Sequence, residues 1–173
     1  GETRSNVALT RSFANSIWPD HADFILRASK VPPEELASRP EIQRIDRDLR
    51  SMMSGLTVVK VKIYDAKGLT VFSTDRRQIG EDKSGNPGYL SARGGTPASD
   101  LTYRARFDPW EGVISDRNII ATYVPVRAQN GAQVAAVMEV YSDVTHLVEK
   151  MERSQWKILA GVQRIWILFG DEL

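Results

Sequence analysis

The sequence predicts an α+β domain in which a five-stranded, mostly antiparallel sheet is flanked by helices. Three observations carry this prediction: apolar residues recur with helical spacing near both ends of the chain, they alternate with polar residues in its middle, and turn signals separate the alternating runs. The chain has 173 residues, of which 42% are hydrophobic and 26% charged, so it can bury a core of its own. We therefore expect a single domain over residues 1–157.

Residues 4–30 have the periodicity of a long N-terminal helix. Leu9, Phe13 and Ile17 recur every four residues, as they do on one face of a helix. Pro19 lies within this stretch, and a proline inside a helix removes one backbone hydrogen bond and clashes with the preceding turn. A kink or a break is therefore expected at this position.

A second helix is predicted after the loop KVPPEELASRP. Ser38 and Glu41 have the spacing of a capping box, in which two side chains bond free backbone N–H groups at the start of a helix. Gly55 can end this helix. Its apolar stripe consists of Ile42, Ile45, Leu49 and Met52. Both helices are amphipathic, so each is expected to cover an apolar surface.

The stretch TVVKVKIYDAKGLTVFST predicts a β-hairpin. We expect this hairpin to be part of the apolar surface that the two helices cover. Its first half alternates apolar residues with Lys60, Lys62 and Tyr64, which is the pattern of a strand with one face in water. Asp65 and Gly68 suit the first and fourth positions of a turn, and the alternation resumes after them.

Three further strands are predicted after residue 100. Residues 101–107 alternate, DPWEG turns the chain, and NIIATYVPVR runs back. Asn130 and Gly131 form the strongest short-range hairpin signal, and they precede a fifth strand in QVAAVMEVYSD. Five strands in meander-like succession, with helices before and after them, predict the mostly antiparallel sheet.

A long insertion separates the second strand from the third. Its sequence, RRQIGEDKSGNPGYLSARGGTPAS, is too long for a bare loop in a compact domain unless it has a function. Asn86 is a good N-cap, Pro87 suits the first helical position, and Gly94 can end a short helix between them. On this helix Tyr89 and Arg93 are four residues apart and project from one face.

A C-terminal helix is predicted over residues 144–169, where apolar residues follow a 4-3 spacing interrupted by Gln155. The helix can pair with a copy of itself or with the first helix, or pack on its own domain. Gln163 and Arg164 interrupt its apolar end, which is too short for a membrane span. Residues 158–173 are expected to form an apolar helical extension that either approaches a membrane span or derives from a vector.

Several functional classes are disfavoured by composition. The net charge of +1 gives no excess of positive charge for binding nucleic acid. The chain has no cysteine, and His21 and His146 have no metal-ligand spacing between them. Motifs for nucleophilic catalysis or phosphate binding are not evident. We therefore expect no enzymatic activity, no metal and no cofactor in this chain.

The order of these elements, with IYDAKGLTVFSTDRRQIGED at its centre, resembles a single Cache domain. This is the PAS-like extracytoplasmic sensor module of bacterial transmembrane receptors, also called the PDC fold. In the hairpin of this family, a first strand reaches a D-x-x-G turn. The second strand then runs back and leads to an IG pair. The resemblance covers about residues 4–157. It implies the periplasmic part of a membrane-anchored, homodimeric receptor that signals through its terminal helices to a histidine kinase or a GGDEF-type diguanylate cyclase.

The resemblance also implies a ligand cavity between the sheet and the insertion. We expect Tyr89, Arg93, Tyr103 and Tyr123 to line it, because an arginine fork and tyrosine hydroxyls suit a small organic acid. The alternatives are that the two strand tyrosines belong to the core and that Arg93 is solvated. Asp143 is more typical of a helix cap than of a ligand for an ammonium group.

Three functional hypotheses follow. The first is a periplasmic sensing domain that binds a small molecule and moves its terminal helices. The alternative is a ligand-free dimerisation or protein-interaction module of the same fold. An intracellular PAS-like cofactor domain is disfavoured, because the chain has no cysteine to react with a flavin and its apolar tail indicates a membrane.

Overall fold

The computed structural model describes most of the chain. Its described backbone covers residues 2–107, 114–128, 131, 133–145 and 164–168. Its described side chains cover residues 4–101, 117–128, 131 and 133–145.

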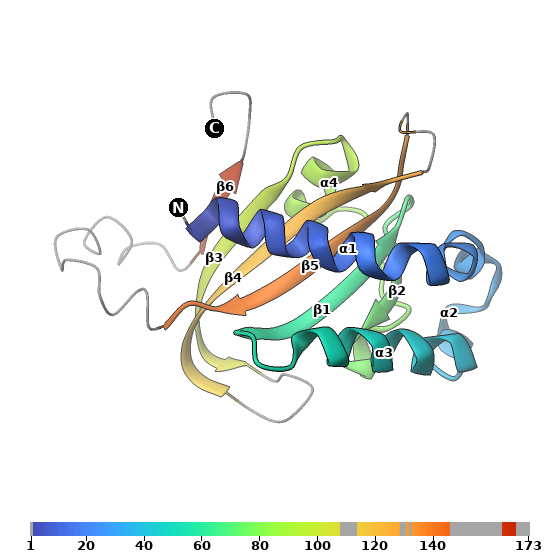
Figure 1. Ribbon diagram of the computed structural model, residues 1–173, viewed down its shortest axis with the longest axis horizontal. Coiled ribbons are helices and arrows are strands. Elements are labelled where there is room, and N and C mark those ends of the chain that lie inside the picture. Colours follow the sequence, from blue (N-terminus) through green and yellow to red (C-terminus); the bar gives the residue numbers. More distant parts are fainter. Residues whose placement is uncertain (1, 108–113, 129–130, 132, 146–163, 169–173) are drawn as a thin grey trace, which may run out of the picture.

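Helices come before the strands and in the insertion between β2 and β3, as the α+β prediction requires (Figure 1). The helices are α1 (Glu2–Arg27), α2 (Pro33–Leu36), α3 (Pro40–Met53) and α4 (Pro87–Arg93), with short 3-10 turns at Ala28–Lys30 and Arg76–Gln78. The strands are β1 (Val58–Asp65), β2 (Thr70–Ser73), β3 (Ala98–Phe107), β4 (Ile114–Arg127), β5 (Val134–Asp143) and β6 (Arg164–Leu168).

The described strands form one antiparallel sheet in the order β2-β1-β5-β4-β3-β6. The five predicted strands and their antiparallel pairing are confirmed. The meander-like succession is wrong, because β1 pairs with β5, and β2 and β3 are not neighbours. The insertion after β2 carries the chain across to the far side of the sheet, so β5 can occupy the centre.

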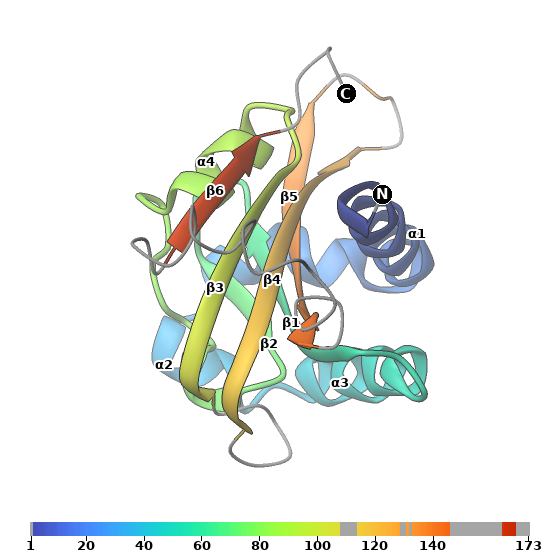
Figure 2. The same ribbon diagram turned by 90° about the vertical axis from the view of Figure 1, so that its left-hand side faces the viewer.

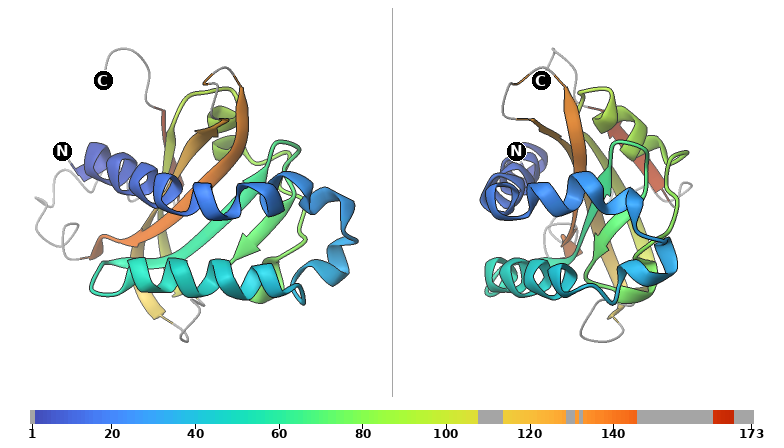
Figure 3. Two further views of the ribbon diagram at one scale, coloured as in Figure 1. Left: turned by 45° about the vertical axis from the view of Figure 1, so that its right-hand side comes forward. Right: turned by 90° about the vertical axis from the view of Figure 1, so that its right-hand side faces the viewer.

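The helices lie in two layers on opposite faces of the sheet. α1 and α3 cover one face, and α4 lies on the other (Figures 2 and 3). Asn86 caps α4 by accepting a hydrogen bond from the backbone N–H of Tyr89 at 2.9 Å, and Pro87 occupies its first turn. This cap confirms the helix that the insertion sequence predicts and fixes where α4 begins.

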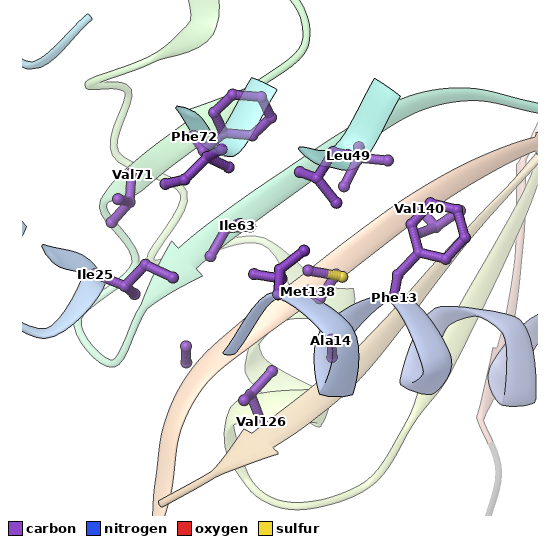
Figure 4. Packing of buried hydrophobic residues seen from close by; sticks show 14 of the residues in the cluster. Phe13, Ala14, Ile25, Leu49, Ile63, Val71, Phe72, Val126, Met138 and Val140 are labelled. Carbon is purple, nitrogen blue, oxygen red and sulfur yellow. The ribbon is translucent and has the colours of Figure 1, made fainter. Parts of the chain in front are cut away.

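The face under α1 and α3 is closed by apolar packing. Figure 4 shows Phe13 and Ala14 of α1 directed at Met138 and Val140 of β5, with Ile63 of β1 beside them. All of these side chains are buried. Burial of this kind contributes roughly 1.5–3 kcal/mol for each large apolar side chain, so this layer stabilises the fold.

The break at Pro19, one of the two alternatives predicted there, does not occur, and neither does the predicted capping box. α1 continues as one helix through Pro19, which is exposed. Burial of Ile17 and Phe24 on either side offsets the single hydrogen bond that the proline removes. The capping box does not form either: α3 begins at Pro40, whose fixed φ suits the first helical position, and Ser38 instead donates to the carbonyl of Glu35 at 2.7 Å.

The C-terminal helix is corrected where the structure describes it. Residues 164–168 form β6, which pairs with β3 at the edge of the sheet, so the prediction of a helix through residue 169 is wrong for this segment. Its sequence RIWIL is rich in β-branched and aromatic residues, which favour strands. Residues 146–163, which hold most of the predicted helix, lie outside the described residues.

Candidate ligand-binding site on the sheet

The face of the sheet opposite α1 and α3 carries charged side chains that are buried. Lys60 and Lys62 on β1 are only 6% and 5% exposed, and Glu139 on β5 is 1% exposed. The sequence pattern predicts a wet face here, and that prediction is wrong. Buried charges are rare unless they are paired, because removal from water destabilises an ion strongly. We call Lys60, Lys62, Tyr64, Tyr123, Glu139 and Tyr141 the sheet-face cluster.

Strand register places the members of this cluster in rows across the sheet. Lys62 on β1 lies opposite Glu139 on β5, and Glu139 in turn lies opposite Tyr123 on β4. In the adjacent row Lys60 lies opposite Tyr141. Directly opposed residues of antiparallel strands share one face, with Cβ atoms about 4.5–5.5 Å apart. Three different strands therefore bring opposite charges and phenols together.

The two lysines share one aromatic ring. The Nζ atom of Lys60 lies 5.3 Å from the ring centroid of Tyr141, and that of Lys62 lies 5.7 Å from it. Both distances are within the range of cation–π attraction. Lys60 also donates a hydrogen bond to Oε1 of Gln78 at 3.1 Å. The cluster thus holds two ammonium groups close together on one side of the carboxylate.

Glu139 is the carboxylate at the centre of the cluster. The hydroxyl of Tyr64 donates a hydrogen bond to its Oε1 atom. Its Oε2 atom is buried and has no hydrogen-bond partner among the described residues. A buried carboxylate oxygen without a donor is unfavourable, so this atom is a strong acceptor for any donor that enters the cluster.

Burial shifts the protonation equilibria of the cluster. Desolvation lowers the pKa of Lys62, and the nearby Glu139 carboxylate partly opposes this change. Desolvation, followed by the charge of Glu139, raises the pKa of Tyr64 and of Tyr123 well above the usual value for a phenol. Both tyrosines therefore remain neutral hydrogen-bond donors at physiological pH.

Two predicted site residues lie in this part of the molecule. Tyr123 is buried as a member of the sheet-face cluster. Tyr89 on α4 is 2% exposed, and its hydroxyl donates to the backbone carbonyl of Asp65 at 2.9 Å. Its ring meets that of Tyr64 edge-on, with 5.6 Å between the centroids. The hydrogen bond and the ring contact together hold α4 beside the cluster.

The other two predicted site residues are Arg93, which neighbours Tyr89, and Tyr103 on β3. Arg93 at the end of α4 is exposed and donates through Nε to the carbonyl of Ala66 at 2.8 Å. The backbone of Tyr103 pairs with Asn118, which is an odd number of residues from Tyr123 on β4. Strand alternation therefore assigns position 103 to the opposite face of the sheet from Tyr123; the side chain of Tyr103 lies outside the described ones.

Asp143 acts as the cap that the sequence analysis favours. Its Oδ1 atom accepts hydrogen bonds from the backbone N–H and the hydroxyl of Thr145, at 2.9 and 2.5 Å. The carboxylate is thus engaged by its own chain just after β5.

The charged members of the cluster were not predicted as site residues. One signal was available in β5, where Glu139 stands in the run VAAVMEVY. Apolar residues at both alternating positions of this run indicate a strand that is buried on both faces. A carboxylate in such a strand must face a buried environment and needs partners there, and the lysines of β1 are its nearest source of positive charge.

Solved structures with a similar fold include two sensor domains and a periplasmic domain. The sensor domain of the V. cholerae histidine kinase DctB and the E. coli DcuS sensor domain each match with a TM-score of 0.49 and 14% identity, and the periplasmic domain of RsbU from Chlamydia trachomatis matches with a TM-score of 0.44 and 11% identity. These matches cover 85%, 86% and 86% of this chain, and 58%, 97% and 56% of the respective structures.

The chain therefore spans a little over half the length of the DctB and RsbU structures. No protein family description matches the sequence, and no curated protein matches it. Among the helices that the structure describes, none has the length and apolar character of a membrane span. The structural neighbours of the chain thus include sensor and periplasmic domains at low sequence identity.

Proposed function

We propose that this chain is the periplasmic signal-sensing domain of a bacterial transmembrane receptor, and that it binds a small organic molecule at the sheet-face cluster. The single observation that carries this proposal is the burial of Lys60, Lys62 and Glu139 on the face that α1 and α3 leave uncovered. A hydrophobic face would stabilise the fold better, because buried ion pairs rarely repay the loss of hydration. Such a cluster is therefore better explained by recognition of a polar ligand.

The ligand class follows from the charges of the cluster. The ammonium groups of Lys60 and Lys62 suit an acidic group of the ligand, and Oε2 of Glu139 suits a hydrogen-bond donor on the same molecule. The phenol of Tyr123 lies beside Glu139 in the same row of the sheet. The proposed ligand is therefore a small organic acid that also carries a hydroxyl or amino group.

The proposed route of the signal is β5. This strand carries Glu139 and ends at Asp143, after which the N–H of Val144 donates to the carbonyl of Asn118 on β4 at 2.8 Å. A ligand that favours one position of β5 would shift the chain that follows it and, on the opposite face, α1. In the full receptor, the proposed readout is a homodimer that couples its terminal helices to a histidine kinase or a diguanylate cyclase.

The proposal is tested by a thermal-shift screen of the purified domain against small hydroxy acids, dicarboxylates, amino acids and amines. A compound that binds only the folded state, at about 100 times its dissociation constant, should raise the unfolding midpoint by about 5 to 10 °C. In Lys62→Met and Glu139→Gln the compound should no longer do so. Arg44→Met, on the exposed face of α3, is the matched control and should respond like the wild type.

Two results would count against this proposal. One is a shift that survives in both cluster variants, provided that each variant unfolds cooperatively without ligand. The other is the lack of any shift across all four compound classes. That result would favour the ligand-free dimerisation module of the same fold.

A further inference from the structure

A second concave surface lies at the other end of α4. It is an open groove of about 680 Å³ between the end of α1, the β1–β2 turn, the end of α4 and the β4–β5 hairpin. Leu26, Ala66, Arg93, Arg127 and Val134 are among its lining residues. In Figure 1 these elements gather at the end of the molecule away from the N-terminus. No described member of the sheet-face cluster lines this groove.

The groove contains two arginines and no acidic residue among its described lining. Arg93 is held by the bond from its Nε to the carbonyl of Ala66, which directs the rest of its guanidinium at the groove wall. Neither Arg93 nor Arg127 pairs with a carboxylate among the residues that the structure describes. The groove therefore concentrates positive charge that the described chain does not neutralise.

The position of Arg127 depends on a glycine. Gly95 follows α4 with a φ of +102°, and a Cβ atom at this position would lie 3.1 Å from a terminal nitrogen of Arg127. The bare backbone of Gly95 lets the guanidinium lie against the end of α4, on the same groove as Arg93. Two planar guanidinium forks on one concave surface suit an oxyanion, which can accept parallel hydrogen bonds from each.

The remaining lining is apolar. Leu26 is 57% exposed at the end of α1, and Val134 and Ala66 also line the groove. An exposed apolar side chain beside two cations suits a ligand with an acidic end and an apolar body.

We propose that this groove is a second binding site, which takes the carboxylate or phosphate group of a small, partly apolar molecule. Arg93 and Arg127 bind the oxyanion, and Leu26 and Val134 contact the apolar body. The proposal agrees with the carboxylate-binding role that the sequence predicts for Arg93, but neither Tyr89 nor Tyr123 is among the described lining of the groove. It stands independently of the sheet-face cluster and of the proposed sensing function.

The test is a titration of ¹⁵N-labelled protein with benzoate and, separately, with phenyl phosphate, at constant ionic strength set by chloride. We expect saturable shifts of the backbone amides of Gly94, Gly95, Ala128 and Gln133, which belong to the groove or its rim. Comparison of the two titrations shows whether the groove prefers a carboxylate or a phosphate group. Removing one arginine should weaken binding at least about tenfold, since charge-assisted hydrogen bonds are lost.

Arg127→Gln is the main variant, because the exposed side chain of Arg127 makes no hydrogen bond among the described residues and its loss should leave the fold intact. Arg93→Gln is the second variant, and Arg44→Gln on α3 is the matched control. Loss of the saturable shifts in Arg127→Gln with retention in Arg44→Gln supports the site. The proposal is overturned if neither probe gives saturable shifts at these amides, or if all three variants bind equally.

Discussion

At the scale of single residues, His21 and Asp48 connect the two helices on the apolar face. Nε2 of the buried imidazole donates a hydrogen bond to Oδ2 of Asp48 at 2.7 Å, which joins α1 to α3. This bond, assisted by Arg47, lowers the pKa of Asp48, although burial opposes the change. The ionised carboxylate is therefore bound more favourably in the folded state than in the unfolded chain.

We predict that Asp48→Asn lowers the free energy of unfolding by about 1 kcal/mol near neutral pH. Because the folded-state pKa of Asp48 lies below the unfolded value, its contribution is complete above the unfolded pKa and disappears as pH falls through the folded pKa. Urea unfolding at about pH 6 and about pH 2.5 should thus show a smaller difference from the wild type at the lower pH.

Asp46→Asn is the control for this experiment, because Asp46 pairs with Arg50 on the same helix at 2.7 Å. Such an exposed i,i+4 pair contributes about 0.3–0.5 kcal/mol. Equal losses in the two variants, or a loss in Asp48→Asn that is undiminished at acid pH, would refute the interhelical role of His21 and Asp48.

Residue-level predictions succeeded where chemistry is local. The Asn86 cap, the turn at Asp65 and the cap at Asp143 all involve groups a few residues apart in sequence. Glu139 and Lys62 were missed as site residues because their pairing depends on which strand lies beside β1. The sequence alone does not determine that neighbour.

At the scale of elements, the β1–β2 turn depends on a glycine that the sequence identified. Gly68 has a φ of +94°, and its N–H donates to the carbonyl of Asp65 at 3.2 Å. The insertion passes directly over this turn, since the N–H of Lys83 donates to the carbonyl of Gly68 at 2.8 Å. A Cβ atom at position 68 would lie 2.5 Å from the Cα atom of Ser84. The hairpin and the insertion are therefore fitted together at this point.

We predict that Gly68→Ala destabilises the domain more than Gly55→Ala. Both positions have positive φ, so both substitutions incur a strain of about 1 kcal/mol. Only position 68 adds a backbone clash, which should raise its total loss to roughly 3 kcal/mol, whereas a Cβ at position 55 meets nothing within 4 Å. Denaturant unfolding of the wild type and the two variants measures the difference. Similar losses in the free energy of unfolding for the two variants would show that the insertion moves aside without cost.

Element types were predicted well because periodicity and turn residues are local signals. The errors at α3 and β6 have a shared origin. Pro40 and the β-branched residues of β6 have backbone preferences that outweighed the spacing of apolar residues, on which the predictions relied.

At the scale of the whole molecule, the two faces of the sheet bury different kinds of side chain. One face is closed by α1 and α3 with apolar side chains (Figure 4). The other face, on which α4 lies (Figure 2), holds the buried charges. The sequence predicted the fold class and the covering helices. It did not predict that β1 and β5 are neighbours, because strand order in a sheet is set by contacts between distant parts of the chain.

This arrangement explains why some of the predicted site residues lie at the sheet-face cluster and another lines the groove. Tyr89 and Tyr123 lie at or beside the sheet-face cluster, whereas Arg93 lines the groove at the end of α4. Periodicity placed Tyr89 and Arg93 on one face of a helix, and the structure agrees: the two side chains interact and bond to the neighbouring carbonyls of Asp65 and Ala66. The ligand-binding roles of all of these residues stay predictions.

The central claim is that the sheet-face cluster binds a small organic acid, and a crystal structure of the domain with a compound that raises its unfolding midpoint tests this most directly. We predict that the acidic group lies within hydrogen-bond distance of Nζ of Lys60 or Lys62 and that a donor of the compound reaches Oε2 of Glu139. A compound bound anywhere else, including the groove lined by Arg93 and Arg127, with the cluster unchanged, would contradict the claim.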